Sequence, residues 1–266
     1  MNATASETVS YLKKAGLYTK GLVYILMGGL TALAALGMGG KTSGKSEVSD
    51  FLKEQPFGIL LLGAVALGLL AYSLWRVYQA WADPGEEKSK ERIPTRLRYL
   101  YSAIFYGAIA YSFAGSLLSG SSGGGDTKQQ MLAQWLEKDW GIYLILGVAA
   151  LVLGQAVFQF YIGIGGSFMK KLDDHPDARA EYRLIKRLGL IGYCARGLVF
   201  LVISYLLVRV VIDHRADHYQ GTKGVFEYIS SLPMGEIVLI ITAVGLALYG
   251  FFNIMVGRHA DLTRVS

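Results

Sequence analysis

The sequence predicts an all-α membrane protein of six transmembrane helices, arranged as three tandem same-direction helix hairpins with pseudo-threefold symmetry about the membrane normal. Three observations predict it. Hydrophobic residues make up 53% of the 266 residues and charged residues only 17%, whereas soluble domains are about 25% charged. The apolar residues gather in six stretches, and these stretches repeat in pairs. β-barrel strands would be about 10 residues long and strictly alternating, so a barrel does not fit.

Each of the six stretches is long enough to cross a bilayer core about 30 Å thick, which requires roughly 20 apolar helical residues. They are Leu17–Gly37, Phe57–Tyr78, Tyr99–Leu118, Gly141–Ile162, Leu188–Val211 and Glu236–Val256. The residues before the first stretch lack the pattern of a secretory signal, so we expect that stretch to be retained as a span. We expect residues 1–266 to form a single membrane domain.

Recurring residues divide the chain into three repeats, at approximately 11–83, 95–166 and 184–258. The odd spans open on related sequences, and the even spans end on an aromatic residue followed by a polar one. The openings are KGLVY (Lys20–Tyr24), SAIFY (Ser102–Tyr106) and RGLVF (Arg196–Phe200), and the endings are Trp75–Arg76, Phe158–Gln159 and Phe252–Asn253. The middle copy lacks the basic residue and the glycine of the opening, so it is the most divergent repeat.

This layout resembles the bacterial family catalogued as domain of unknown function 1206, whose members carry three copies of a paired transmembrane helix. The resemblance rests on the K/R-G-L-V-Y/F openings. It also rests on the even spans in which a glycine and a tyrosine precede the aromatic–polar ending, as at Gly68 and Tyr72 and at Gly245 and Tyr249. It extends from about Tyr11 to Arg258. It implies the fold and a membrane location, and it implies no activity.

The distribution of basic residues predicts the orientation. The two ends of the chain and the second and fourth loops carry roughly twice as many lysine and arginine residues as the other loops, and such residues accumulate on the cytoplasmic side. We therefore expect a bacterial inner (plasma) membrane protein with both termini in the cytoplasm. The net charge of +6 is explained by these loops, so no nucleic-acid partner is expected. Before each even span, a short amphipathic segment is predicted to lie as a helix in the outer membrane interface.

The spans hold few groups that could perform chemistry. Glu236, at an outer helix end, is their only acidic residue, whereas proton pumps and intramembrane enzymes carry ionisable groups at mid-depth. We expect no enzymatic activity and no cofactor. We expect a protein that binds or scaffolds membrane lipid, anionic lipid included, or a protein partner, which includes a second copy of the chain. A small channel or transporter with a path between the repeats is the alternative.

Two local motifs resemble known sites without their usual context. Gly39–Ser46 satisfies the phosphate-binding pattern G-x4-G-K-S, but no strand precedes it, so we interpret it as a flexible turn. His214 and His218 are spaced i, i+4, which would place both imidazoles on one face of a helix and allow a metal to bind. A polar helix end is the simpler interpretation, and no metal site is predicted. Cys194 is interpreted as an inert, packed thiol.

The polar residues at the cytoplasmic ends of the spans are the best candidates for a site. They are Lys20 and Arg196, which open odd spans, and Arg76, Gln159 and Asn253, which close even spans. Two interpretations stay open. The side chains reach separately to lipid headgroups, or they converge into a cytoplasm-facing pocket for an anionic headgroup or small anion.

Overall fold

The computed structural model describes residues 3–38, 45–54, 56–82, 92–119, 132–171, 179–216 and 221–259. It confirms the all-α class, because every regular element in these ranges is helical. The elements are α1 (Ala3–Ala35), α2 (Lys45–Glu54), α3 (Gly58–Ala82), α4 (Arg92–Ser119), α6 (Asp139–Gly165), the 3₁₀ turn η2 (Ser167–Lys171), α7 (Arg179–Ile212), α8 (Gly221–Ser230) and α9 (Gly235–Arg258). A short helical segment, 132–136, precedes α6.

Five of the described helices are long and apolar enough to cross a membrane. Their apolar segments are Tyr11–Ala35, Gly58–Trp81, Trp140–Gly165, Ala180–Ile212 and Gly235–Arg258. The sixth predicted span, Tyr99–Leu118, lies in α4, which is helical throughout but is not among these five. Tyrosine and serine residues dilute its apolar character. Length and composition thus support a membrane protein, and five of the six predicted spans coincide with helices that could cross a membrane.

A glycine recurs at the start of α3, α6 and α9, the second long helix of each repeat, because the chain folds back tightly there. Phe57 and Met234 adopt positive φ values of 61° and 59° immediately before Gly58 and Gly235. A Cβ added at either glycine would collide with carbonyl oxygens of the preceding short helix. A Cβ added at Gly141 would likewise collide with the carbonyl oxygen of Trp135. The turn therefore requires a residue without a side chain at all three equivalent positions.

The short helices α2 and α8 turn their apolar side chains toward the protein. Val48 and Leu52 of α2 are buried, and so are Val225, Phe226 and Ile229 of α8. Helix α2 packs on α1 and α3, and α8 packs on α7 and α9. The sequence predicts that these amphipathic segments lie in the outer membrane interface. In the structure their apolar faces complete the protein core.

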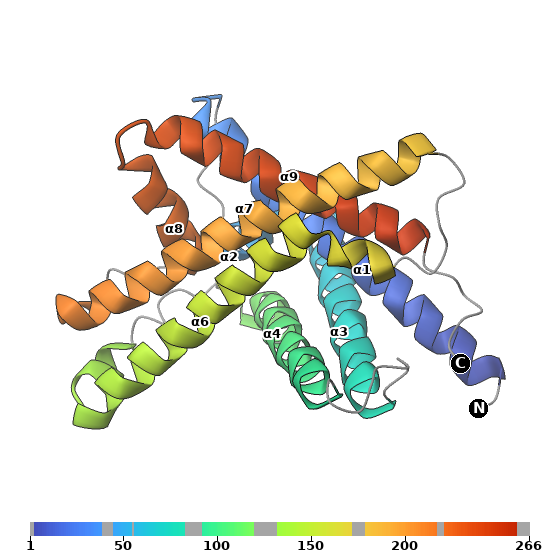
Figure 1. Cartoon of the computed structure of the whole chain (residues 1–266), viewed down its shortest axis with the longest axis horizontal. Coiled ribbons are helices and arrows are strands. Elements are labelled where there is room, and N and C mark those ends of the chain that lie inside the picture. Colours follow the sequence, from blue (N-terminus) through green and yellow to red (C-terminus); the bar gives the residue numbers. More distant parts are fainter. Residues whose placement is uncertain are drawn as a thin grey trace.

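The long helices follow each other around a ring (Figure 1). The three most extensive contacts join the second helix of one repeat to the first helix of the next: α3 to α4, α6 to α7, and α9 back to α1. Within the first and third repeats, α1 also contacts α3 and α7 contacts α9. The chain is thus a threefold repeat whose last helix packs against its first.

The helix crossings use equivalent positions in different repeats. Where α1 crosses α9, Gly21 and Gly250 meet backbone to backbone, and a Cβ on Gly21 would lie 2.7 Å from the Gly250 oxygen. Where α4 crosses α3, the equivalent residues are Ala103 and Ser73, and the Ser73 hydroxyl donates a hydrogen bond of 2.8 Å to the Ala103 carbonyl. Small residues therefore let the backbones approach closely.

The middle repeat departs from the expected hairpin. Its two helices, α4 and α6, have hardly any contact with each other in the described residues, and they diverge in Figure 1. Each packs on the neighbouring repeat instead. The ring is therefore closed by contacts everywhere except between α4 and α6.

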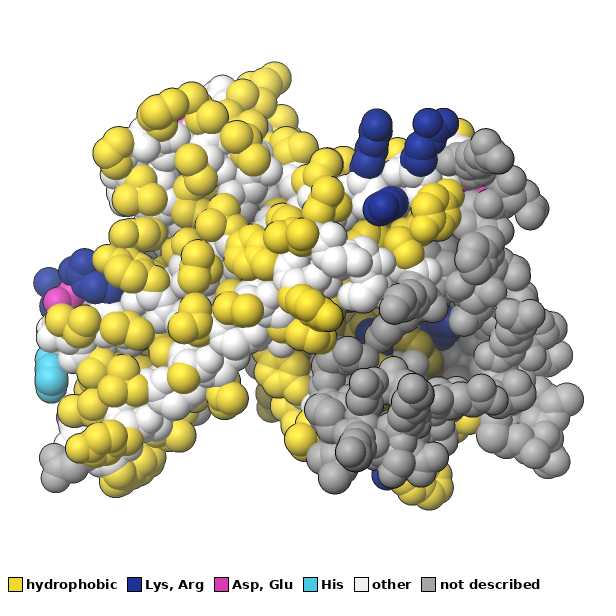
Figure 2. Space-filling model, in the orientation of Figure 1, with side chains coloured by type: hydrophobic (Ala, Val, Ile, Leu, Met, Phe, Trp, Pro, Cys, Tyr) yellow, Lys and Arg dark blue, Asp and Glu magenta, His cyan; other side chains and the backbone are white. Residues whose placement is uncertain are grey.

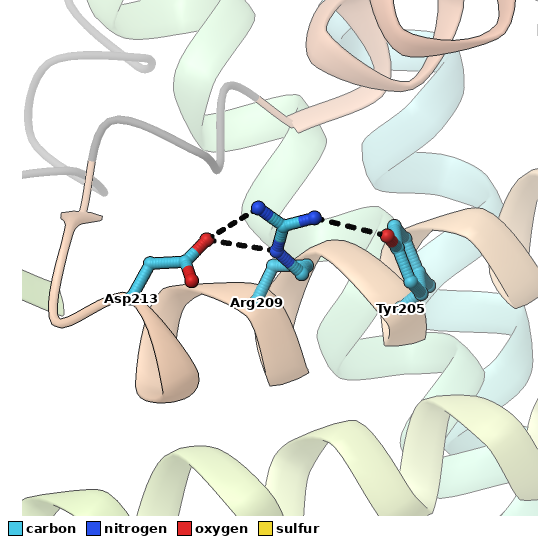
Figure 3. A network of polar contacts seen from close by, with 3 residues as sticks. All are labelled: Tyr205, Arg209 and Asp213. Atoms are coloured by element: carbon cyan, nitrogen blue, oxygen red, sulfur yellow. Dashed lines mark hydrogen bonds and ion pairs between the residues drawn. The ribbon is translucent and has the colours of Figure 1, made fainter. Parts of the chain in front are cut away.

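Charged side chains occupy the ends of α7, and apolar side chains cover most of the face between them (Figure 2). At the end near Ile212, Arg209 binds Asp213 with its Nε and Nη2 at 2.8 and 2.6 Å and donates to the Tyr205 hydroxyl at 3.2 Å (Figure 3). The ring of Tyr205 lies 5.2 Å from that of Tyr228, and the hydrogen bond that the Tyr228 hydroxyl donates to Tyr205 raises the pKa of Tyr228. This network ties α7 to α8.

Candidate functional site

Two glycines let the first helix of a repeat pack closely against a tyrosine of the second: α1 against Tyr72 of α3, and α7 against Tyr249 of α9. A Cβ added to Gly16 would lie 2.7 Å from the Cα of Tyr72, and one added to Gly192 would lie 2.7 Å from the Cα of Tyr249. The basic residues Lys20 and Arg196 follow these glycines by one helical turn, so they face the same tyrosines. The first and third repeats thereby build the same local arrangement.

Lys20 is enclosed by aromatic rings. Its side chain keeps only 5% exposure. Its Nζ lies 5.2 Å from the ring centroid of Tyr72, 5.2 Å from that of Tyr106 and 5.0 Å from that of Tyr249. All three distances are within the range of cation–π attraction, which reaches about 6 Å. The three rings come from the first, second and third repeats, so Lys20 lies where the repeats meet.

Arg196 occupies the equivalent place in the third repeat. It is 8% exposed, its Nη1 donates a hydrogen bond of 2.6 Å to the Tyr249 hydroxyl, and its Cζ lies 4.6 Å from the centroid of that ring. The rings of Tyr24 and Phe200 lie 5.4 and 5.5 Å from the guanidinium. Because Lys20 also contacts Tyr249, both cations lie against the same aromatic side chain.

The tyrosines repeat the same pairwise geometry. Tyr72 and Tyr106 pack edge to face, with centroids 4.8 Å apart and planes at 77°. Tyr249 and Tyr24 occupy the equivalent positions, at 5.0 Å and 79°. We call these four tyrosines, with Lys20, Arg76 and Arg196, the cation–tyrosine cluster. Its symmetry follows from the sequence repeat rather than from chance packing.

Arg76 lies at the edge of the cluster and is half-buried. Its Nε and Nη2 donate to the Tyr72 hydroxyl at 3.0 and 2.6 Å, and its Nη1 donates to Gln79 at 2.8 Å. The ring of Trp75 lies 4.5 Å from its Cζ. Trp75 is itself buried, so it supports Arg76 rather than anchoring the helix at the lipid surface.

The two predicted amides are buried but are placed differently. The Asn253 side chain donates a hydrogen bond of 2.6 Å to the Tyr249 carbonyl of its own helix. Gln159, on α6, is 3% exposed, and its Oε1 has no hydrogen-bond partner. The structure therefore brings Lys20, Arg76 and Arg196 into one cluster, with Asn253 one helical turn away. Gln159 lies on α6, which packs chiefly on α7.

The cluster carries positive charge without a matching carboxylate. Among the described residues, no Asp or Glu forms an ion pair with Lys20, Arg76 or Arg196. The Nε of Arg196 is buried and has no hydrogen-bond partner. A cation at the centre of a membrane helix costs roughly 2.5–3.5 kcal/mol by insertion scales, and each ring returns about 2 kcal/mol when the pair is desolvated. The aromatic rings can therefore stabilise the buried cations, but they do not neutralise the net positive charge.

Sequence reasoning identified the cations and missed the tyrosines. Tyrosine and tryptophan are common as anchors at membrane interfaces, which fits the exposed Trp81 and Trp140 but not the buried Tyr72 or Tyr249. The available signal was the spacing, since Tyr24 follows Lys20 by four residues and Tyr72 precedes Arg76 by four. The low exposure of Lys20 and Arg196 also places their side chains inside the protein.

The other candidate motifs lie elsewhere. Helix α7 ends at Ile212 and His214 has a φ of 50°, so His214 is not on a helix as the i, i+4 interpretation required. His218 and most of Gly39–Ser46 lie outside the described residues. A surface hollow of about 300 Å³ lies on the first turns of α7, where Ala180, Arg183, Leu184 and Arg187 line it.

Comparisons with known proteins agree with the repeat structure. The model of the family described as Domain of Unknown Function (DUF1206) matches three times, at residues 15–83, 97–166 and 191–260. The chain is also 30% identical over 267 residues to the uncharacterized protein YxxB of Bacillus subtilis (strain 168), covering 99% of this chain and 96% of that protein. No solved structure matches.

Proposed function

From the premise that this chain belongs to the DUF1206 family, we propose that it is a bacterial inner-membrane protein that binds an anionic group at the cation–tyrosine cluster. In this proposal the protein has six membrane spans, arranged as three two-helix repeats around a pseudo-threefold axis, and it binds rather than catalyses. The observation that carries the proposal is the pair Lys20 and Arg196. Both are more than nine-tenths buried, and no described carboxylate pairs with them.

The place of α4 in the ring supports its role as the sixth span. The helix has 28 residues, and at about 1.5 Å per residue its length exceeds the thickness of a bilayer core. It packs on α3 as α1 packs on α9, and its Tyr106 matches Tyr24 in position and geometry. A helix that takes the same place as two apolar spans is expected to cross the membrane with them.

The proposed orientation places the first turns of α7 in the cytoplasm and α8 outside. Cysteines substituted at Ala180 and Ser230, both exposed, should label from opposite sides in a Cys194→Ser background. An impermeant maleimide added to intact cells should modify only Ser230→Cys, and both sites should react after permeabilisation. Labelling of Ala180→Cys in intact cells would reverse the orientation.

An anion at the cluster would neutralise two buried cations at once. Phosphate oxygens can accept from the Lys20 ammonium and from the unpartnered Nε of Arg196, and charge-assisted hydrogen bonds of this kind are roughly twice as strong as neutral ones. A phospholipid headgroup and a soluble phosphate both supply this chemistry.

Native mass spectrometry tests the binding. Protein purified in mild detergent from membranes that contain phosphatidylglycerol should retain that lipid. Lys20→Gln and Arg196→Gln should each reduce the retention roughly tenfold or more, because each removes a charged hydrogen bond worth about 1.5–3 kcal/mol. The matched control is Arg187→Gln, since Arg187 is exposed on the same helix and outside the cluster. Inorganic phosphate added as a competitor distinguishes a soluble ligand from a headgroup.

A second measurement separates loss of binding from loss of folding. Uncompensated buried cations often destabilise a protein relative to apolar residues of similar size. Lys20→Met and Arg196→Met should therefore unfold at the wild-type temperature or higher in lipid-free detergent, while they retain no anion. Equal retention of phosphatidylglycerol and phosphate by all variants would reject the proposed function. Ion flux through reconstituted protein without retention would also reject it, in favour of a channel.

A further inference from the structure

The open side of the helix ring coincides with the repeat that contributes only Tyr106 to the cluster and lacks its basic residue. Every neighbouring pair of long helices packs together except α4 and α6. In the middle repeat, Ser102 stands where Lys20 and Arg196 stand in the other two, and Gln155 stands where Tyr72 and Tyr249 stand. The same helices thus lack both the mutual contact and the pairing of a cation with a tyrosine that the other two repeats have.

The helix at this opening is the most lipid-exposed of the five apolar spans. Only 22% of its apolar segment is buried inside the structure, against 39–50% for the others. Leu151, Leu153 and Val157 are exposed along it. Among these apolar residues, α6 carries two glutamines, the half-buried Gln155 and the buried Gln159, whose Oε1 lacks a partner. An exposed apolar helix that carries two glutamines one turn apart suits an amphipathic molecule.

We propose that a phospholipid with an anionic headgroup enters the bundle sideways between α4 and α6, with its phosphate at Lys20 and Arg196 and an acyl chain along α6. This inference rests on the proposed function and names its ligand class and route. Charge complementarity selects the headgroup, because the cluster is cationic and lacks a described carboxylate. The route selects a lipid over free phosphate, because the opening would face hydrocarbon, from which a soluble anion is excluded. The Gln159 amide can bind a headgroup hydroxyl.

A photoreactive side chain at the opening tests the route. The full-length protein would carry p-benzoylphenylalanine in place of Gln155, in vesicles of phosphatidylethanolamine with a minority of phosphatidylglycerol. Leu153 is the matched control position, because it lies on the same helix and is exposed. Adducts at residue 155 should be enriched several-fold in phosphatidylglycerol over the bulk bilayer, whereas adducts at residue 153 should have the bulk composition. Arg196→Gln should abolish the enrichment.

The outcomes separate the route from the binding. Bulk composition at residue 155, with phosphatidylglycerol still retained by the purified protein, would overturn sideways entry and leave the proposed function standing. Loss of both signals would overturn the proposed function itself. If the benzoylphenylalanine variant does not fold, Gln155→Cys carrying a benzophenone maleimide, in a Cys194→Ser background, provides the same readout from a smaller substitution.

Discussion

Replacing Gly28 with valine is expected to break the contact between α1 and α9 and to unfold much of the protein. A Cβ at Gly28 would collide with the Ala243 carbonyl and would lie 2.6 Å from the Ala247 nitrogen, both backbone atoms of α9. Backbone atoms cannot move aside unless the two helices separate. Overpacking a close contact costs about 1–3 kcal/mol, and occasionally more. We expect a lower thermal unfolding midpoint in detergent and a smaller yield of monodisperse protein.

The neighbouring glycine provides the control. Gly29 lies on the same helix, and a Cβ added there meets nothing within 4 Å. Gly29→Val should therefore unfold at nearly the wild-type temperature. Equal effects at the two positions would show that helix propensity, rather than the crossing of α1 and α9, decides the result, because both substitutions change propensity alike.

Replacing Tyr249 with leucine is expected to have the second large effect. Tyr249 is 1% exposed, contacts both Lys20 and Arg196 and packs against Tyr24. Truncating a buried aromatic ring costs about 3–5 kcal/mol, and here the cations also lose a ring worth about 2 kcal/mol. Tyr249→Phe keeps the ring and removes only the acceptor for Arg196, at a cost of about 1–3 kcal/mol.

Thermal unfolding of the series should rank the proteins as wild type, then Tyr249→Phe, then Tyr249→Leu. Tyr161→Leu is the matched control, because Tyr161 is 69% exposed on α6 and should tolerate the change. If Tyr249→Leu unfolds with the control, the rings do not hold the cations, and the cluster needs a different explanation.

Periodicity and repeat matching predicted the helices well because both depend on local sequence. The five apolar spans and the equivalence of the three repeats could be read directly, and so could the glycines at the starts of the even helices. The pairing of α4 with α3, and of α6 with α7, could not. It depends on which small residues meet across a crossing, such as Ser73 with Ala103, and those residues are far apart in the chain.

The candidate site was predicted in part for the same reason. Lys20, Arg76 and Arg196 stand out as charged residues in apolar helices, which single-sequence reasoning detects. The tyrosines do not stand out, because tyrosine is common at membrane interfaces and only the fold shows which rings turn inward. Whether Gln159 joins the three cations depends on the divergent middle repeat, for which the other two copies are a poor guide.

The contact between α1 and α9 also limits when the protein can complete its folding during synthesis. The first helix made must wait for the last one made, and at about 5–20 residues per second the wait lasts on the order of tens of seconds. During that interval Lys20 has no Tyr249 beside it, and the glycine face of α1 has no partner. A chain that stops before α9 therefore leaves Lys20 with the rings of Tyr72 and Tyr106 but without that of Tyr249. This partly enclosed charge distinguishes an incomplete molecule from a finished one.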